Sequence, residues 1–239
     1  MVKFHPISAI ALAVTLFCPD YAAAASRPIL AELFTSQGCS SCPPADALLG
    51  ELAGRPDVLA LSFHVDYWDG LGWKDPYSLP LATRRQRRYA ELLGSETYTP
   101  QLVVDGRRQA VGSDRPAVEK LLQTARSDSA RAGIDERDGA FDIRIGAAIG
   151  PEPEVAAEIW LVTFDPAHRT PVRGGENGGR SLPTFDDVRS MRSIGFWRGT
   201  PVAVTEVRTS ADLGERAAVI VQSADGEVWA LAATVLGGS

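Results

Sequence analysis

The sequence is poor in cysteine, in net positive charge and in long apolar runs, and each shortage excludes a class of protein. Its 239 residues include three cysteines, and 24 Lys and Arg stand against 30 Asp and Glu, which gives a net charge of -6. Without a basic patch to neutralise phosphates, nucleic acid is not an expected partner. The apolar run at residues 7–17 is shorter than the roughly 20 residues that span a bilayer, so no stable membrane insertion is expected.

The first 25 residues have the features of a secretory signal peptide. Lys3 and His5 precede the apolar run, and small residues from Ala22 to Ala25 follow it. A positive segment, a short apolar core and an A-x-A ending are the parts of such a signal. We therefore expect cleavage after Ala24 or Ala25 and an exported protein, periplasmic or secreted. The alternative is a buried N-terminal helix, in which the alanine pattern has no use.

Removal of the signal peptide also removes Cys18, so the mature chain keeps only Cys39 and Cys42. A single pair so close in sequence is not the framework of a disulfide-stapled protein. A purely structural disulfide here closes a very short loop and contributes about 2 kcal/mol. A structural zinc site normally takes four ligands, and His64 and His168 do not have the spacing of a zinc site. A redox-active pair is the favoured interpretation.

The mature chain is expected to fold as an α/β unit followed by a smaller β-rich unit. Residues 26–127 predict strand, helix, strand, helix, hairpin and helix, which together form one α/β domain. The polar and charged residues 128–138 are expected to be a linker. Alternating apolar residues within 139–239, with a tight hairpin at 225–226, predict a small antiparallel sandwich or an extra sheet. Residues 174–199 carry no clear pattern, and no internal repeat is visible.

Cys39 and Cys42 stand at the start of the first predicted helix. Pro43 and Pro44 are tolerated only in a first helical turn, where the missing N–H has no partner. Unpaired N–H groups and the positive end of the helix dipole lower a thiol pKa from about 8.5, which favours the attacking thiolate. We therefore assign attack to Cys39 and resolution of the mixed disulfide to Cys42. No organic cofactor is implied.

Thr99 and Pro100 provide a second signal. Pro100 begins a predicted strand just ahead of a tight hairpin, which is a position compatible with a cis peptide bond. A Cys-x-x-Cys at a helix start together with such a proline is the layout of the thioredoxin fold, in which the proline loop faces the cysteines. The sequence therefore predicts a thioredoxin-like domain over 26–127, with Pro100 shaping the substrate groove.

Several segments of the chain carry a resemblance to a known family. They are ELFTSQGCSSCPPA at residues 32–45, FHVDYWD at 63–69, YTPQ at 98–101, VDG at 104–106 and GENGGR at 175–180. Together they resemble the secreted family catalogued as domain of unknown function 1223. The resemblance covers nearly the whole mature chain and implies a thioredoxin-like domain with a β-rich extension. It implies no substrate.

Three polar side chains are supporting candidates near the cysteines. Glu32 lies in the strand that leads to Cys39, and a buried carboxylate there would take the proton from Cys42 during exchange. Pairing with an arginine is the alternative for Glu32. His64 and Asp66 end the neighbouring strand, and strand ends of open α/β sheets collect at ligand sites. A histidine that is only packed in the core is the alternative for His64.

Three further features have both a functional and a structural interpretation. Tyr67, Trp68 and Trp73 would form an aromatic wall for a peptide or a small thiol, or would cap the core. The arginines within 84–88 would meet an anionic partner or form a solvated helix face. The glycines within 174–179 lack the ending of a phosphate-binding loop and are expected to form a flexible loop.

These observations predict one function and leave two alternatives. The chain is expected to be an exported thiol–disulfide oxidoreductase whose Cys39–Cys42 pair exchanges with a dithiol or disulfide protein or with a small thiol. One alternative is a protein that binds Cu(I) through Cys39 and Cys42, because soft sulfur ligands suit that ion. The other is a non-catalytic interaction module that contains an inert disulfide.

Overall fold

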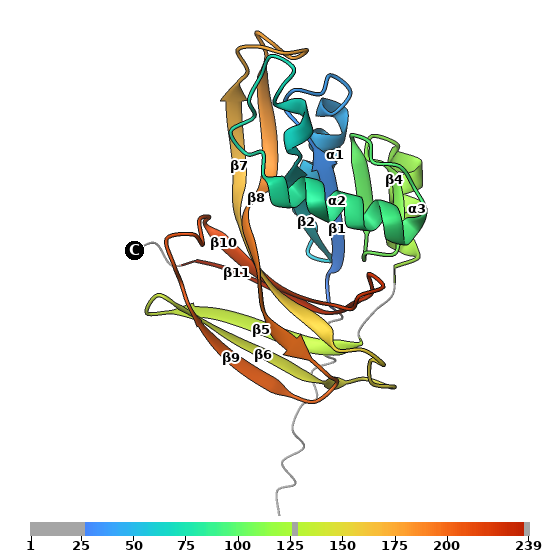
Figure 1. Ribbon diagram of the computed structural model, residues 1–239, viewed down its shortest axis with the longest axis vertical. Helices are drawn as coiled ribbons and strands as arrows, with labels where there is room; N and C mark the ends of the chain where they lie inside the picture. The colour runs from blue at the N-terminus through green and yellow to red at the C-terminus, as the bar shows by residue number, and fades with distance from the viewer. Residues whose placement is uncertain (1–26, 126–128, 237–239) are drawn as a thin grey trace, which may run out of the picture.

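The computed structural model describes residues 27–125 and 129–236, which form a mixed α/β structure with one large and one small sheet (Figure 1). The expected signal peptide, residues 1–25, lies outside the described residues. In the described part of the chain no helix is long and apolar enough to cross a membrane. The elements are β1 (Ile29–Thr35), α1 (Pro43–Ala53), β2 (Val58–His64), a 3-10 turn (Asp66–Trp68), α2 (Pro80–Leu93), β3 (Gln101–Val104), β4 (Arg108–Val111), α3 (Arg115–Gln123), β5 (Ala130–Arg137), β6 (Ala140–Ala148), β7 (Ala157–Pro171), β8 (Ser181–Trp197), β9 (Val202–Val207), β10 (Arg216–Gln222) and β11 (Val228–Val235).

The large sheet contains strands from both halves of the sequence. Its strand order is β11-β10-β7-β8-β2-β1-β3-β4. β1 and β2 are parallel, β3 runs antiparallel to β1, and β2 meets β8 at the single pair Ser62–Asp187. The residues of β2 are buried along the whole strand, as expected for a strand covered on both faces.

Helices α1 and α3 cover one face of β1 to β4. Leu33 of β1 and Leu102 of β3 pack there against Leu49 of α1 and Val118 of α3. Helix α1 begins with two prolines, as the sequence predicts, and ends at Gly54. Asp114 caps α3 by accepting a hydrogen bond from the N–H of Ala117 (3.1 Å).

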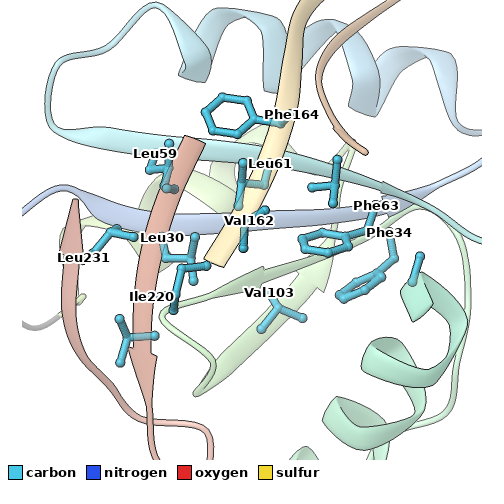
Figure 2. Close-up of a cluster of buried hydrophobic side chains, with 14 of the residues drawn as sticks. Leu30, Phe34, Leu59, Leu61, Phe63, Val103, Val162, Phe164, Ile220 and Leu231 are labelled. Atoms are coloured by element: carbon cyan, nitrogen blue, oxygen red, sulfur yellow. The ribbon is translucent and has the colours of Figure 1, made fainter. Parts of the chain in front are cut away.

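The opposite face of β1 and β2 is covered by α2 together with strands from the second half of the chain. Figure 2 shows Val162 of β7 and Ile220 of β10 packed against Leu30 and Leu61, on strands that cross β1 and β2. The second half therefore supplies part of the hydrophobic core of the first half.

The division into a domain, a linker and a second domain does not match this architecture. Residues 130–137, expected within the linker 128–138, form β5, which pairs with β6. Ala130 and Ile134 are buried, while Arg131 and Arg137 are exposed, so a polar stretch contains a strand with one covered face. Four strands of the expected β-rich unit 139–239 also belong to the large sheet.

The small sheet, in the order β5-β6-β9, packs on the second face of β7, β10 and β11 (Figure 1). Phe141 of β6 and Trp197 of β8 are fully buried in this second core, beside Leu161 and Val219. This part of the structure is a sandwich of the small sheet and one end of the large sheet. Most of residues 174–199, which carried no clear pattern, form the 17-residue strand β8.

Gly50 marks the place where α1 packs against β8. A Cβ at position 50 would lie 2.6–2.8 Å from ring carbons of Phe185. We expect Gly50→Ala to lower the free energy of unfolding by about 1–3 kcal/mol because this overpacking outweighs the better helix propensity of alanine. Urea denaturation measures the change, with Gly54→Ala as the control, since its nearest neighbour would lie at 3.4 Å. Equal stabilities of the two variants would contradict this packing.

Candidate functional site

A disulfide joins Cys39 and Cys42 directly before α1, with the two Cα atoms 5.4 Å apart. The carbonyl of Cys42 accepts hydrogen bonds from the N–H groups of Ala45 and Asp46, so Cys42 is built into the first turn of the helix. The N–H of Cys39 donates to the carbonyl of Ser36 (3.1 Å) and closes the preceding loop. Both cysteines therefore lie at the helix start that the sequence predicts.

Both cysteine residues are fully buried, with 0% of their surface exposed. Residues 172–180, which join β7 to β8, contribute to this cover. Asn177 Nδ2 donates to the carbonyls of Gln37 (3.0 Å) and Cys39 (2.8 Å), and Glu176 Oε2 accepts from the N–H of Ser40 (3.0 Å). The glycine-rich segment was expected to be a flexible loop. The side chains of its central residues bind it to residues 36–42, here called the cysteine loop.

The peptide bond between Thr99 and Pro100 is cis, and Pro100 is buried beside the start of α1. Gly112 lies between them: a Cβ there would be 3.1 Å from the Cβ of Ala45 and 3.4 Å from the Cβ of Pro100. The N–H of Gly112 also donates to the carbonyl of Pro100 (2.9 Å). The structure therefore brings the predicted proline loop close to the helix that follows the cysteines.

Two tryptophans connect the surrounding loops to the segment before Cys39. Trp68 Nε1 donates to Thr99 Oγ1 (2.9 Å), and Trp73 Nε1 donates to Gln37 Oε1 (3.2 Å). The Cβ of Trp68 lies 3.4 Å from the position that a Cβ on Gly38 would occupy. These two rings pack against the cysteine loop.

Glu32 does not lie on the cysteine side of the sheet. Its carboxylate accepts from Arg85 Nε (2.6 Å) and from the Tyr89 hydroxyl (2.5 Å), and the residue is fully buried. Leu30 and Phe34, two residues before and after Glu32 in β1, share its face and pack on the side covered by α2. The structure shows the alternative given for Glu32, in which its carboxylate pairs with an arginine. The expectation that Glu32 takes the proton of Cys42 is wrong.

Asp46 is a further candidate site residue that the sequence analysis did not identify. It lies one helical turn after Cys42, is 6% exposed, and accepts a hydrogen bond from Thr35 Oγ1 (2.7 Å). Burial raises the pKa of Asp46 to about 7, although the nearby His64 cation and the Thr35 hydrogen bond pull it downward. The available sequence signal was its spacing of four from Cys42, which places both residues on one side of the helix.

His64 lies behind this site in a buried ionic cluster. Its Nδ1 is 2.7 Å from Asp75 Oδ2, and its Nε2 is 3.0 Å from Asp187 Oδ1. Burial disfavours the cation, but the two carboxylates outweigh this and raise the pKa of His64 well above its usual range. Asp75 Oδ2 also accepts from the N–H of Gln37 (2.7 Å), so the cluster is connected to the cysteine loop.

Asp66 has a different role from the one expected. Its Oδ1 accepts from Thr83 Oγ1 (2.5 Å), and its N–H donates to the same hydroxyl (3.1 Å). Thr83 belongs to α2, so Asp66 joins the 3-10 turn to that helix. Within residues 27–125 and 129–236, no group of three His, Cys, Asp or Glu side chains is arranged to hold a metal ion.

Comparison with known proteins gives a family and a structural relative. A family model described as "Protein of unknown function (DUF1223)" matches residues 30–222. The crystal structure of protein AGR_C_4864 from Agrobacterium tumefaciens is similar, with a TM-score of 0.76 and 28% sequence identity. The match covers 90% of this chain and 96% of that chain. No curated protein matches the chain.

The raised pKa of Asp46 makes stability depend on pH. Between its unfolded value of 3.8 and its folded value of about 7, the folded protein holds a proton that the unfolded chain has lost. The free energy of unfolding therefore falls over this range, by about 4 kcal/mol in total. We expect Asp46→Asn to remove this fall, as measured by urea denaturation from pH 4 to 8. The exposed Asp57→Asn is the control, and an unchanged profile in Asp46→Asn would contradict the assignment.

His64 stabilises the fold as a cation, and its raised pKa also makes the free energy of unfolding fall as the pH rises, over a higher pH range than for Asp46. The contribution of His64 is fully present below the unfolded pKa of about 6.5 and is lost as the pH rises through the raised folded value. We expect His64→Gln to lower the free energy of unfolding by about 3–5 kcal/mol at pH 6, because two buried carboxylates lose their counterion. The loss should be smaller at pH 9. His168→Gln serves as the control. A loss of unfolding free energy in His64→Gln that does not vary with pH would contradict this explanation.

Proposed function

This chain belongs to the DUF1223 family, and we propose that it is an exported thiol–disulfide oxidoreductase whose first half is thioredoxin-like. The order of elements from β1 to α3 and the position of Cys39 and Cys42 before α1 support the fold assignment. The burial of Pro100 beside the start of the same helix supports it further.

The proposed reaction is an exchange of two electrons with a dithiol. A partner thiolate attacks the sulfur of Cys39, the Cys39–Cys42 bond breaks, and its electron pair stays on Cys42, which then takes a proton. The second partner thiol loses its proton and attacks the partner's sulfur in the mixed disulfide, which releases Cys39 as a thiolate. The partner is oxidised to a disulfide, and the pair is reduced to a Cys42 thiol and a Cys39 thiolate, which exchanges a proton with water according to its pKa. The same steps run in reverse when the partner is the stronger oxidant.

The observation that carries this proposal is the buried carboxyl of Asp46, one helical turn behind Cys42. A group that gives and takes a proton works best when its pKa is near the working pH, and burial raises the pKa of Asp46 to about 7. We assign to Asp46 the proton exchanged with Cys42.

The full burial of both cysteines favours a second candidate, a non-catalytic module with an inert disulfide. An inert disulfide has a reduction potential below about -300 mV and resists the common thiol pools. Catalytic pairs have potentials between about -270 and -120 mV and a thiolate pKa well below 8.5. The two candidates therefore differ in measurable quantities.

We expect the mature chain, beginning at residue 26, to have a Cys39–Cys42 potential in the catalytic range. Equilibration with thiol–disulfide buffers of known potential, followed by alkylation and mass measurement, gives this value. The pH dependence of Cys39 alkylation in Cys42→Ser gives the thiolate pKa, and the double variant with both cysteines replaced by serine is the blank. A potential below about -300 mV together with an unreactive Cys39 leaves only the inert disulfide.

A further inference from the structure

We propose that residues 172–180, here called the strap, select which thiols reach the Cys39–Cys42 disulfide, and that the selected class is protein dithiols. This inference rests on the proposed redox function. Its structural basis is a segment from the second half of the chain that is seated on the main chain around Cys39.

The contacts of the strap are directed at the loop that holds Cys39. The amide of Asn177 donates to the carbonyls of Gln37 and Cys39, and Glu176 accepts from Ser40. Asn177 is fully buried and is the single asparagine of the chain. Its Oδ1 accepts from Arg180 Nη1 (2.6 Å), which leaves the Nδ2 group turned toward the two carbonyls.

The strap is also a closed unit that fits against the loop around Gly72 and Trp73. The N–H of Val172 donates to the carbonyl of Arg180, and the N–H of Gly179 donates back to Val172 (both 2.9 Å). A Cβ on Gly174 would lie 2.2 Å from the carbonyl oxygen of Gly72, so only glycine permits this approach. These contacts hold the strap together, so we expect it to move away from the loop around Cys39, or to remain on it, as one unit.

Neither cysteine has exposed surface, so a reductant reaches Cys39 only when a segment around it moves, and the strap is a segment bound directly to the main chain of Gln37, Cys39 and Ser40. Withdrawal of Asn177 leaves the carbonyls of Gln37 and Cys39 without their donor at a buried position, whereas the exposed N–H of Ser40 can bond to water when Glu176 leaves. A buried polar group without a partner is costly. A protein that lays an extended segment over the site brings backbone N–H and C=O groups to replace these contacts. A small thiol brings few such groups, so the strap disfavours it.

The test compares reduction of the disulfide by glutathione and by a reduced thioredoxin-type protein in the full mature chain. We expect Asn177→Ala to raise the second-order rate constant for glutathione at least tenfold and that for the protein less than threefold. Asn177→Asp keeps the size of the side chain, removes the donor, and should behave in the same way. Arg173→Ala changes an exposed side chain of the strap and should react as the unchanged protein does.

Hydrogen exchange of the Ser40 amide, measured in the same samples, reports whether the strap has opened. Equal glutathione rates in all four proteins, with faster Ser40 exchange in the Asn177 variants, would overturn the role of the strap and leave the oxidoreductase proposal standing. A disulfide that neither reductant attacks, even in variants with an opened strap, would overturn the oxidoreductase proposal itself. A gain for glutathione confined to the Asn177 variants supports both.

Discussion

The buried pairing of His64 with Asp75 and Asp187 is the interaction on which the rest of the structure depends. The three residues come from β2, from the loop after it and from β8, so one ionic cluster joins both halves of the chain. Asp75 continues the connection to Gln37 at the cysteine loop. A buried cation between two carboxylates is stable only when all partners are present, which fixes the relative position of these segments.

The start of α1 was predictable because its signals are local. Two cysteines, two prolines and an apolar helix face follow one another within a few residues, and the helix begins where they require. Strand β8 and the Asp187–His64 contact were not predictable in this way. The partners are 123 residues apart in sequence, and β8 is covered on alternating sides by different neighbours along its length, so it shows no single hydrophobic period.

Two buried carboxylates close to the cysteines in sequence show how far residue type alone can mislead. Glu32 and Asp46 are both close in sequence to the cysteines, but strand alternation turns Glu32 toward Arg85 and Tyr89 on the other side of the sheet. Helical spacing keeps Asp46 on the side of Cys42. The strand period around Glu32 and the helix period around Asp46 are both readable in the sequence. Which face of the sheet each side chain reaches is seen only in the folded structure.

The crossing of β7 and β10 over β1 and β2 determines when this protein can finish folding. Leu30, Leu61 and Phe63 are covered by residues that are synthesised much later, among them Ile220 and Leu231. A chain that emerges from its N-terminus therefore carries an open core until its last strands arrive. The contacts of residues 172–180 with the loop around Cys39 likewise form only after the whole first half has been synthesised.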